Sequence, residues 1–117
     1  MKFETSSDAR EFIESVFSRV GARNQAILGR AALFLALGEG VQTEFKPKDA
    51  KGVTLNDEQV VDDNLRDLVH AALNHRAGHS LDEGGYRQEF RRHFEYGCQR
   101  LRQLWAESGN DQAQFVS

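Results

Sequence analysis

The sequence contains one cysteine, one proline and no apolar run longer than the seven residues 31–37. The single thiol, Cys98, cannot form an internal disulfide and suits a reducing compartment. The longest apolar run is too short to cross a bilayer. The first ten residues, "MKFETSSDAR", are polar where a signal peptide needs an apolar segment. We therefore expect a cytoplasmic protein that has no membrane segment.

The sequence also lacks an excess of basic charge, since its net charge is −3 and only four of its residues are lysines. This balance argues against a globally basic nucleic-acid binder, although a local basic patch remains possible. The 117 residues fit one domain. We expect this domain to span residues 1–107 and a polar, mobile tail to follow over residues 108–117.

No acidic residue occurs from Ser15 through Gly38, and the second half of this stretch is apolar on all sides. Such a pattern predicts a helix that is buried by several neighbours. A small domain covers such a helix poorly, so we expect a homo-oligomer. Arg23 and Arg30 lie about two turns apart here, and together they can hold a phosphate near the helix start. Alternatively, Arg30 is buried and pairs with a carboxylate from another helix or subunit, which its apolar neighbours favour.

Hydrophobic periodicity predicts a mainly α-helical fold with at most a few very short strands. Extended segments are expected at residues 2–5, 43–45 and 52–55. Helices are expected over residues 8–20, from residue 22 to Gly38 or Gly40, over about 57–77 and over about 86–106. Glycines supply the stop signals, at Gly21, at Gly38 or Gly40, and at Gly78. Asn56 and Gln59 form a plausible capping box for the third helix.

Basic side chains cluster in two places. Lys46, Lys48 and Lys51 surround the only proline, and Arg87, Arg91 and Arg92 lie in the first part of the last helix. Arginines one turn apart can clamp the phosphate oxygens of a nucleic-acid backbone. The alternative is a solvated helix face that is partly paired with carboxylates.

No catalytic or metal-binding motif is present. His70 and His75 are five residues apart and so point to different helix faces, and the sequence contains no HExxH, GxSxG, P-loop or CxxC motif. We therefore expect no enzymatic activity, no cofactor and no metal. His93 and Gly97 lie one turn apart on the last helix, where the glycine allows another backbone to come close. We interpret His93 as a hydrogen-bonded structural group.

Two stretches resemble one known family. "NQAILGRAALFLALGEG" resembles the Arg-Ala-small-apolar-Leu segment of the DNA sulfur-modification protein family DndE, and "FRRHFEYGCQRL" resembles the late helix of that family. The order of a short strand, a helix, a glycine turn and a second helix is that of a ribbon-helix-helix unit. The positions carried over from the family are Arg30, Leu37, Phe90, Arg91, His93 and Gly97.

The resemblance implies a small helical domain with a ribbon-helix-helix-like first half and two further helices. It implies a non-catalytic accessory subunit of the machinery that replaces a non-bridging phosphate oxygen of DNA with sulfur. Such subunits bind nicked or duplex DNA, assemble as homo-oligomers, tetramers among them, and work beside other DNA sulfur-modification proteins. The expected DNA-binding residues are Lys46, Lys48, Lys51, Arg87, Arg91, Arg92 and Arg23. The expected structural or interface residues are Arg30, His93 and Gly97.

Two other functions stay open. The net charge of −3 motivates a protein-interaction subunit of a defence complex that makes no direct contact with DNA. A ribbon-helix-helix repressor needs a β-ribbon that reads the major groove, for which "KFET" offers only Lys2 and Thr5 as polar readers.

Overall fold

The computed structural model describes residues 1–108, without the side chains of residues 17, 18 and 20–26. The side chain of Arg23 and residues 109–117 of the expected tail therefore lie outside the described part. The elements in chain order are β1 (Lys2–Glu4), α1 (Ser7–Phe12), the π-helical segment η1 (Ile13–Phe17), α2 (Ser18–Glu39), β2 (Thr54–Asn56), α3 (Asp57–Val60), α4 (Asp63–Ala77) and α5 (Glu83–Glu107). The expectation of a mainly α-helical fold is confirmed.

The strands β1 and β2 form a small antiparallel sheet. Its register pairs Phe3 with Leu55. The ring of Phe3 is buried and meets the rings of Phe90 and Phe94 of α5 at centroid distances of 5.2 and 5.4 Å. The alternation of "KFE" therefore sends one apolar side chain into the core. The extended piece expected at 43–45 is instead a turn and irregular loop.

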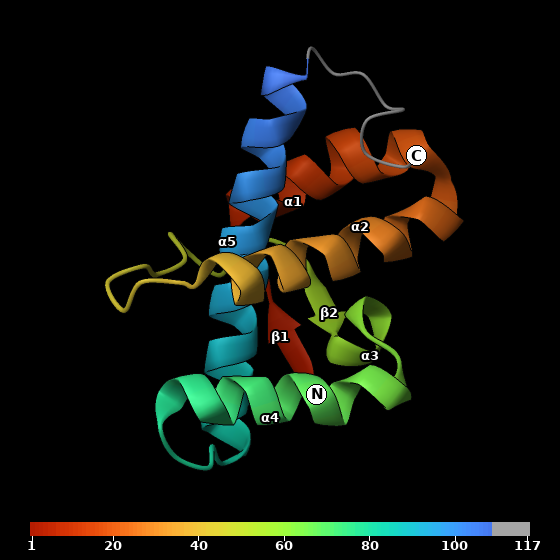
Figure 1. Cartoon of the computed structure of the whole chain (residues 1–117). Coiled ribbons are helices and arrows are strands. Elements are labelled where there is room, and N and C mark those ends of the chain that lie inside the picture. The colour runs from red at the N-terminus through yellow and green to blue at the C-terminus, as the bar shows by residue number, and fades with distance from the viewer. Residues whose placement is uncertain (109–117) are drawn as a thin grey trace.

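The first two predicted helices join into one helical run. The N-cap of α1 is Ser6, whose hydroxyl accepts a hydrogen bond from Ala9 N at 3.0 Å. The helix then passes through η1 directly into α2, so the prediction that Gly21 ends it is wrong. A helix-interior glycine costs only about 1 kcal/mol relative to alanine, which its neighbours can offset. Figure 1 shows the chain turning back between α1 and the long part of α2.

The third predicted helix is divided in two. The Asn56–Gln59 capping box is present and starts α3. Val61 then adopts an extended conformation and is buried, and Asp62 caps α4 by accepting a hydrogen bond from Leu65 N at 3.1 Å. The helical apolar spacing continues across this break, which explains why periodicity alone missed it. The stop at Gly78 is confirmed by its φ of 79°.

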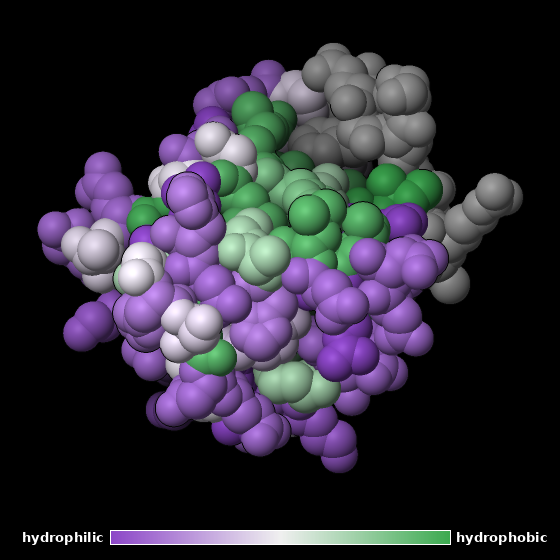
Figure 2. Space-filling view, turned by 60° about the horizontal axis from the view of Figure 1, so that its bottom comes forward, coloured by the Kyte–Doolittle hydropathy of each residue, from purple (hydrophilic) through white to green (hydrophobic). Residues whose placement is uncertain are grey.

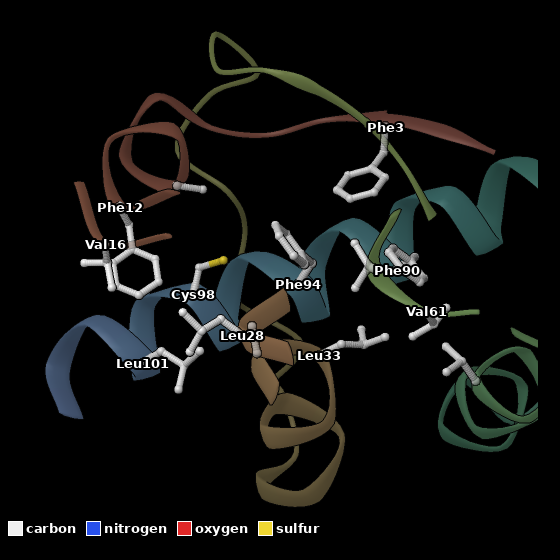
Figure 3. Packing of buried hydrophobic residues seen from close by; sticks show 14 of the residues in the cluster. Phe3, Phe12, Val16, Leu28, Leu33, Val61, Phe90, Phe94, Cys98 and Leu101 are labelled. Atoms are coloured by element: carbon white, nitrogen blue, oxygen red, sulfur yellow. The ribbon is translucent and has the colours of Figure 1, made fainter. Parts of the chain in front are cut away.

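The helices α2 and α5 cross at the centre of the molecule, and α4 crosses the other end of α5 (Figure 1). Figure 3 shows the buried cluster gathered around α5, with side chains from β1, α1 and α2. The largest fully buried apolar side chains are Phe90, Phe94, Leu28, Leu33, Leu73, Val61 and Val69. The core therefore lies around α5, where α2 crosses it.

The helix α2 buries one face and leaves the other partly uncovered. Ala32, Leu33 and Ala36 are buried, whereas Ile27 and Phe34 are 41% and 37% exposed. Figure 2 shows apolar residues gathered in a patch bordered by hydrophilic ones. The expected burial of this helix by neighbouring elements is therefore seen on one face within the described chain. Burial of its other face by further subunits stays a prediction.

Candidate nucleic-acid interface

The segment between α2 and β2, residues 41–53, is here called the lysine loop. It carries Lys46, Lys48 and Lys51, all three exposed. Phe45 and Pro47 alternate with the first two lysines and are half-buried. The loop therefore packs its apolar side chains on the domain and presents its ammonium groups to solvent.

Arg92 of α5 holds the first half of the lysine loop. Its Nε donates to the Phe45 carbonyl at 3.1 Å and its Nη2 donates to the Gln42 carbonyl at 2.7 Å. Its Nη1 donates to Glu89 Oε2 at 2.6 Å, and the side chain is only 12% exposed. A planar guanidinium with five donors suits such a multiple attachment.

Arg91 holds the second half of the loop. Its Nε donates to the Glu4 carbonyl at 2.6 Å and its Nη2 donates to the Asp49 carbonyl. Arg87, one turn earlier, donates from Nε to the Lys2 carbonyl at 3.0 Å and is half-exposed. The three arginines thus attach β1 and the lysine loop to α5. Contact of these arginines with phosphate stays a prediction. Arg87 is the most exposed of the three and is therefore the most accessible to a phosphate.

Asp49 ties the lysine loop to the start of α1. Its carboxylate accepts hydrogen bonds from Ser7 N at 2.8 Å, from Ser7 Oγ at 2.7 Å and from Lys51 N at 3.0 Å. The bond from Lys51 N, followed by the two from Ser7, lowers the pKa of Asp49 from 3.8 to about 2. The Asp49 carboxylate therefore accepts hydrogen bonds within the domain, although its neighbours in sequence are exposed lysines.

The lowered pKa of Asp49 predicts a pH dependence of stability. Because the folded-state pKa lies below the ordinary value of 3.8, the contribution is present above pH 4 and is lost as the pH falls toward 2. Asp49→Asn should therefore lower the urea midpoint at pH 5, and the difference from wild type should shrink toward pH 2. Asp8→Asn, which also removes a carboxylate near the start of α1, is the control. An unchanged difference across this range would contradict the assignment.

Glu95 is a buried carboxylate on α5, and its burial was not predicted from the sequence. It accepts hydrogen bonds from Ser6 N at 2.5 Å and from Ser6 Oγ at 2.9 Å. Burial raises the pKa of Glu95, against the lowering effect of the Ser6 hydrogen bonds. Its position between Phe94 and Cys98 on the apolar stripe of α5 was the available signal. Glu95 and Asp49 together occupy the amide groups at the start of α1.

His93 and Gly97 lie on the buried side of α5. His93 is 2% exposed, and its Nδ1 lies 2.7 Å from the Glu89 carbonyl, while Nε2 has no partner among the described residues. Burial lowers the pKa of His93. A Cβ built on Gly97 would lie 1.7 Å from the Ala32 carbonyl oxygen of α2. The two helix backbones therefore approach each other at a point that only glycine allows.

Arg30 is half-buried on α2, and no carboxylate lies within ion-pair distance of it in the described part of the chain. An intrachain carboxylate partner, one of the two options for Arg30, is therefore missing from these residues. Pairing of Arg30 with a carboxylate outside these residues or in another subunit stays a prediction.

The described residues hold no group of three or more His, Cys, Asp or Glu side chains placed to bind a metal ion. His75 and His79 are exposed, while the ring of His70 lies 4.5 Å from that of Tyr86.

Cys98 is buried, and this burial raises its thiol pKa well above the ordinary value, so the thiol stays protonated. No described helix offers a stretch apolar and long enough to cross a membrane.

Comparison with known proteins identifies the family. A family model described as "DNA sulphur modification protein DndE" matches residues 2–107, which include every described helix and both strands. Neither the curated proteins nor the solved structures gave a match. The match covers both stretches on which the sequence resemblance rested. The chain therefore belongs to the DndE family of DNA sulphur modification proteins.

Proposed function

We propose that the protein is a non-catalytic accessory subunit of a DNA phosphorothioation system and binds the backbone of nicked or duplex DNA. The lysine loop carries this proposal, because its three exposed lysines stand on a segment fixed by Arg91, Arg92 and Asp49. Fixed cations bind phosphates at a smaller entropic cost than cations on a mobile loop. The family's role in DNA sulfur modification supplies the class of ligand.

The overall charge of −3 does not prevent a local basic surface. Within the lysine loop, three lysines stand beside two carboxylates, Glu44 and Asp49. Asp49 is directed toward Ser7 by two hydrogen bonds. The exposed part of the loop is therefore more basic than its composition suggests.

Removal of the lysine charges tests the proposed function. The triple variant K46A/K48A/K51A should bind duplex DNA more weakly than wild type and reduce the slope of log affinity against log salt by about two to three. Fluorescence anisotropy titrations at two or more salt concentrations measure both quantities. Lys2→Ala, at an exposed position of β1, is the control for loss of a single charge. Unchanged affinity and slope in the triple variant would contradict the proposal.

A second candidate function is protein interaction within the same machinery, which the exposed apolar side chains of α2 favour. Pull-down from the host with nuclease treatment separates the two functions. Protein partners that survive the nuclease support the interaction role. Partners that are lost with the nucleic acid support DNA as the bridging ligand.

We also propose that the protein is a homo-oligomer, with a tetramer as the first expectation from the family. Ile27 and Phe34 would be covered in the assembly, and Arg30 lies between them in the sequence. Light scattering at micromolar concentration should give a multiple of 13.2 kDa. Phe34→Glu should reduce this mass, whereas Gln88→Glu, at an exposed position of α5, should leave it unchanged. A wild-type mass near that of one chain would remove the proposal.

A further inference from the structure

A cavity of about 510 Å³ lies between α1, the lysine loop and α5. Phe12, Phe45 and Pro47 contribute apolar surface to it, and Lys46, Lys48 and Arg102 contribute cations. Cavities of about 300–1,000 Å³ with apolar walls and a few polar groups are typical of sites for small ligands. The cavity adjoins the lysine loop, whose ammonium groups the proposed function assigns to DNA phosphates.

Phe45 is held in place in the wall of this cavity. Its amide donates a hydrogen bond to the Gln42 carbonyl at 3.0 Å, and its carbonyl accepts a hydrogen bond from the Arg92 guanidinium. Its ring meets Tyr96 edge to face, with centroids 5.5 Å apart and an interplanar angle of 87°. The Tyr96 hydroxyl donates to Glu39 at 2.8 Å. The ring is therefore a fixed aromatic surface, half-buried beside exposed lysines.

The sequence Phe45–Lys46–Pro47–Lys48 interleaves ring surfaces with cations, and all four residues line the cavity. Sites for single-stranded nucleic acid combine these same two features, because bases stack on rings while cations follow the backbone. Gln99 and Gln103, one turn apart on α5, line the same cavity and are exposed. Their carboxamides can donate to and accept from the edge of a base.

Two carboxylates also border the cavity and limit where a phosphate can lie. Asp8 is exposed, and both Glu95 oxygens accept hydrogen bonds from Ser6. Both belong to the side formed by α1 and the middle of α5. A phosphate is therefore expected near Lys46, Lys48 and Arg102, with the base directed toward Phe45.

We propose that this cavity receives one unpaired nucleotide of the bound DNA, with the base on Phe45 and Pro47 and the phosphate near Lys46, Lys48 and Arg102. This inference rests on the proposed function. A base that is paired within a duplex has both faces stacked, so only an extruded or unpaired base can enter. The exposed Lys46 and Lys48 can also contact the phosphates of an intact duplex. The cavity adds affinity only for DNA with an unpaired base.

Anisotropy titrations with two labelled duplexes test the proposal. Both have the same sequence, and one carries a single unpaired adenosine. Wild type should bind the second duplex at least about fivefold more tightly, which corresponds to the lower end of base–aromatic stacking. Phe45→Leu should lose this preference while its affinity for the paired duplex changes less than twofold. Phe45→Tyr should keep the preference, and the fluorescence of Trp105 reports that each variant is folded.

The outcomes separate the two levels of inference. Equal affinity of wild type for both duplexes overturns the nucleotide site and leaves the proposed function standing. No binding of either duplex at low salt overturns the proposed function and the site with it. A preference that persists in Phe45→Leu overturns the stacking assignment. Binding of a glutamate-rich, phenylalanine-containing peptide that Phe45→Leu abolishes, without any preference between duplexes, would assign the cavity to a protein partner.

Discussion

Gly97→Ala should lower the melting temperature by more than about 10 °C. The added Cβ would lie 1.7 Å from the carbonyl oxygen and 2.3 Å from the carbonyl carbon of Ala32, so two helix backbones must move apart. Overpacking in a well-packed core costs about 1–3 kcal/mol and occasionally more, and a backbone obstacle belongs at the upper end. In a domain of this size, 1 kcal/mol shifts the melting temperature by about 4 °C, so a loss of about 3 kcal/mol lowers it by more than about 10 °C.

Gly38→Ala is the matched control, because Gly38 lies near the end of α2 with nothing within 4 Å of its built Cβ. This substitution should raise the free energy of unfolding by about 0.5 kcal/mol, since alanine loses less backbone entropy than glycine in a helix. Urea unfolding followed by circular dichroism measures both variants. A Gly97→Ala protein as stable as wild type would show that α2 and α5 do not meet this closely.

Asp57→Ala should cost about 3 kcal/mol of unfolding free energy. The Asp57 carboxylate is fully buried and accepts hydrogen bonds from the Tyr86 hydroxyl at 3.1 Å and the Met1 amino group at 3.0 Å. Arg66 Nε lies 3.2 Å from the same carboxylate. Removing one partner of a buried charge pair leaves the others unsatisfied, which costs about 3–5 kcal/mol, and partial exposure of Arg66 places the loss at the lower end.

Asp63→Ala is the control for the buried carboxylate, because Asp63 contacts the same arginine at 3.4 Å but is 87% exposed. Exposed ion pairs contribute up to about 1 kcal/mol, so this variant should remain close to wild type. Denaturant midpoints of the two variants provide the comparison. Equal losses would mean that Asp57 acts only through its charge on Arg66, and that its burial and its bond to Tyr86 contribute nothing.

The helices were predictable from the sequence because their apolar residues repeat at helical spacing and their ends carry local signals. The Asn56–Gln59 capping box and the left-handed Gly78 are short-range features that need no tertiary context. The break at Val61 was not predictable in this way. The apolar positions on both sides of it keep helical spacing, and burial of Val61 against distant residues decides its conformation.

The candidate site was predicted in composition but not in arrangement. The lysines at 46, 48 and 51 and the arginines at 87, 91 and 92 were recognised as basic clusters, since charge can be counted along the chain. The structure shows that the arginines hold the lysine loop and β1, while the lysines face solvent. This arrangement depends on contacts between residues more than 40 positions apart, such as Arg92 with Phe45. The acceptors are backbone carbonyls, which every residue has, so no side-chain pattern reveals them.

The hydrogen bonds from Arg87 and Arg91 to β1 also affect how copies of the chain can associate. Residues 1, 3 and 5 of the amino-terminal segment face β2, so the Lys2 and Glu4 carbonyls point to the opposite edge of the strand. That edge is where a ribbon shared between two copies would form, and it is occupied by guanidinium groups. Covered edges block strand addition and edge-to-edge aggregation. Addition of a strand from another copy at this edge of β1 would therefore require that Arg87 and Arg91 first release the Lys2 and Glu4 carbonyls.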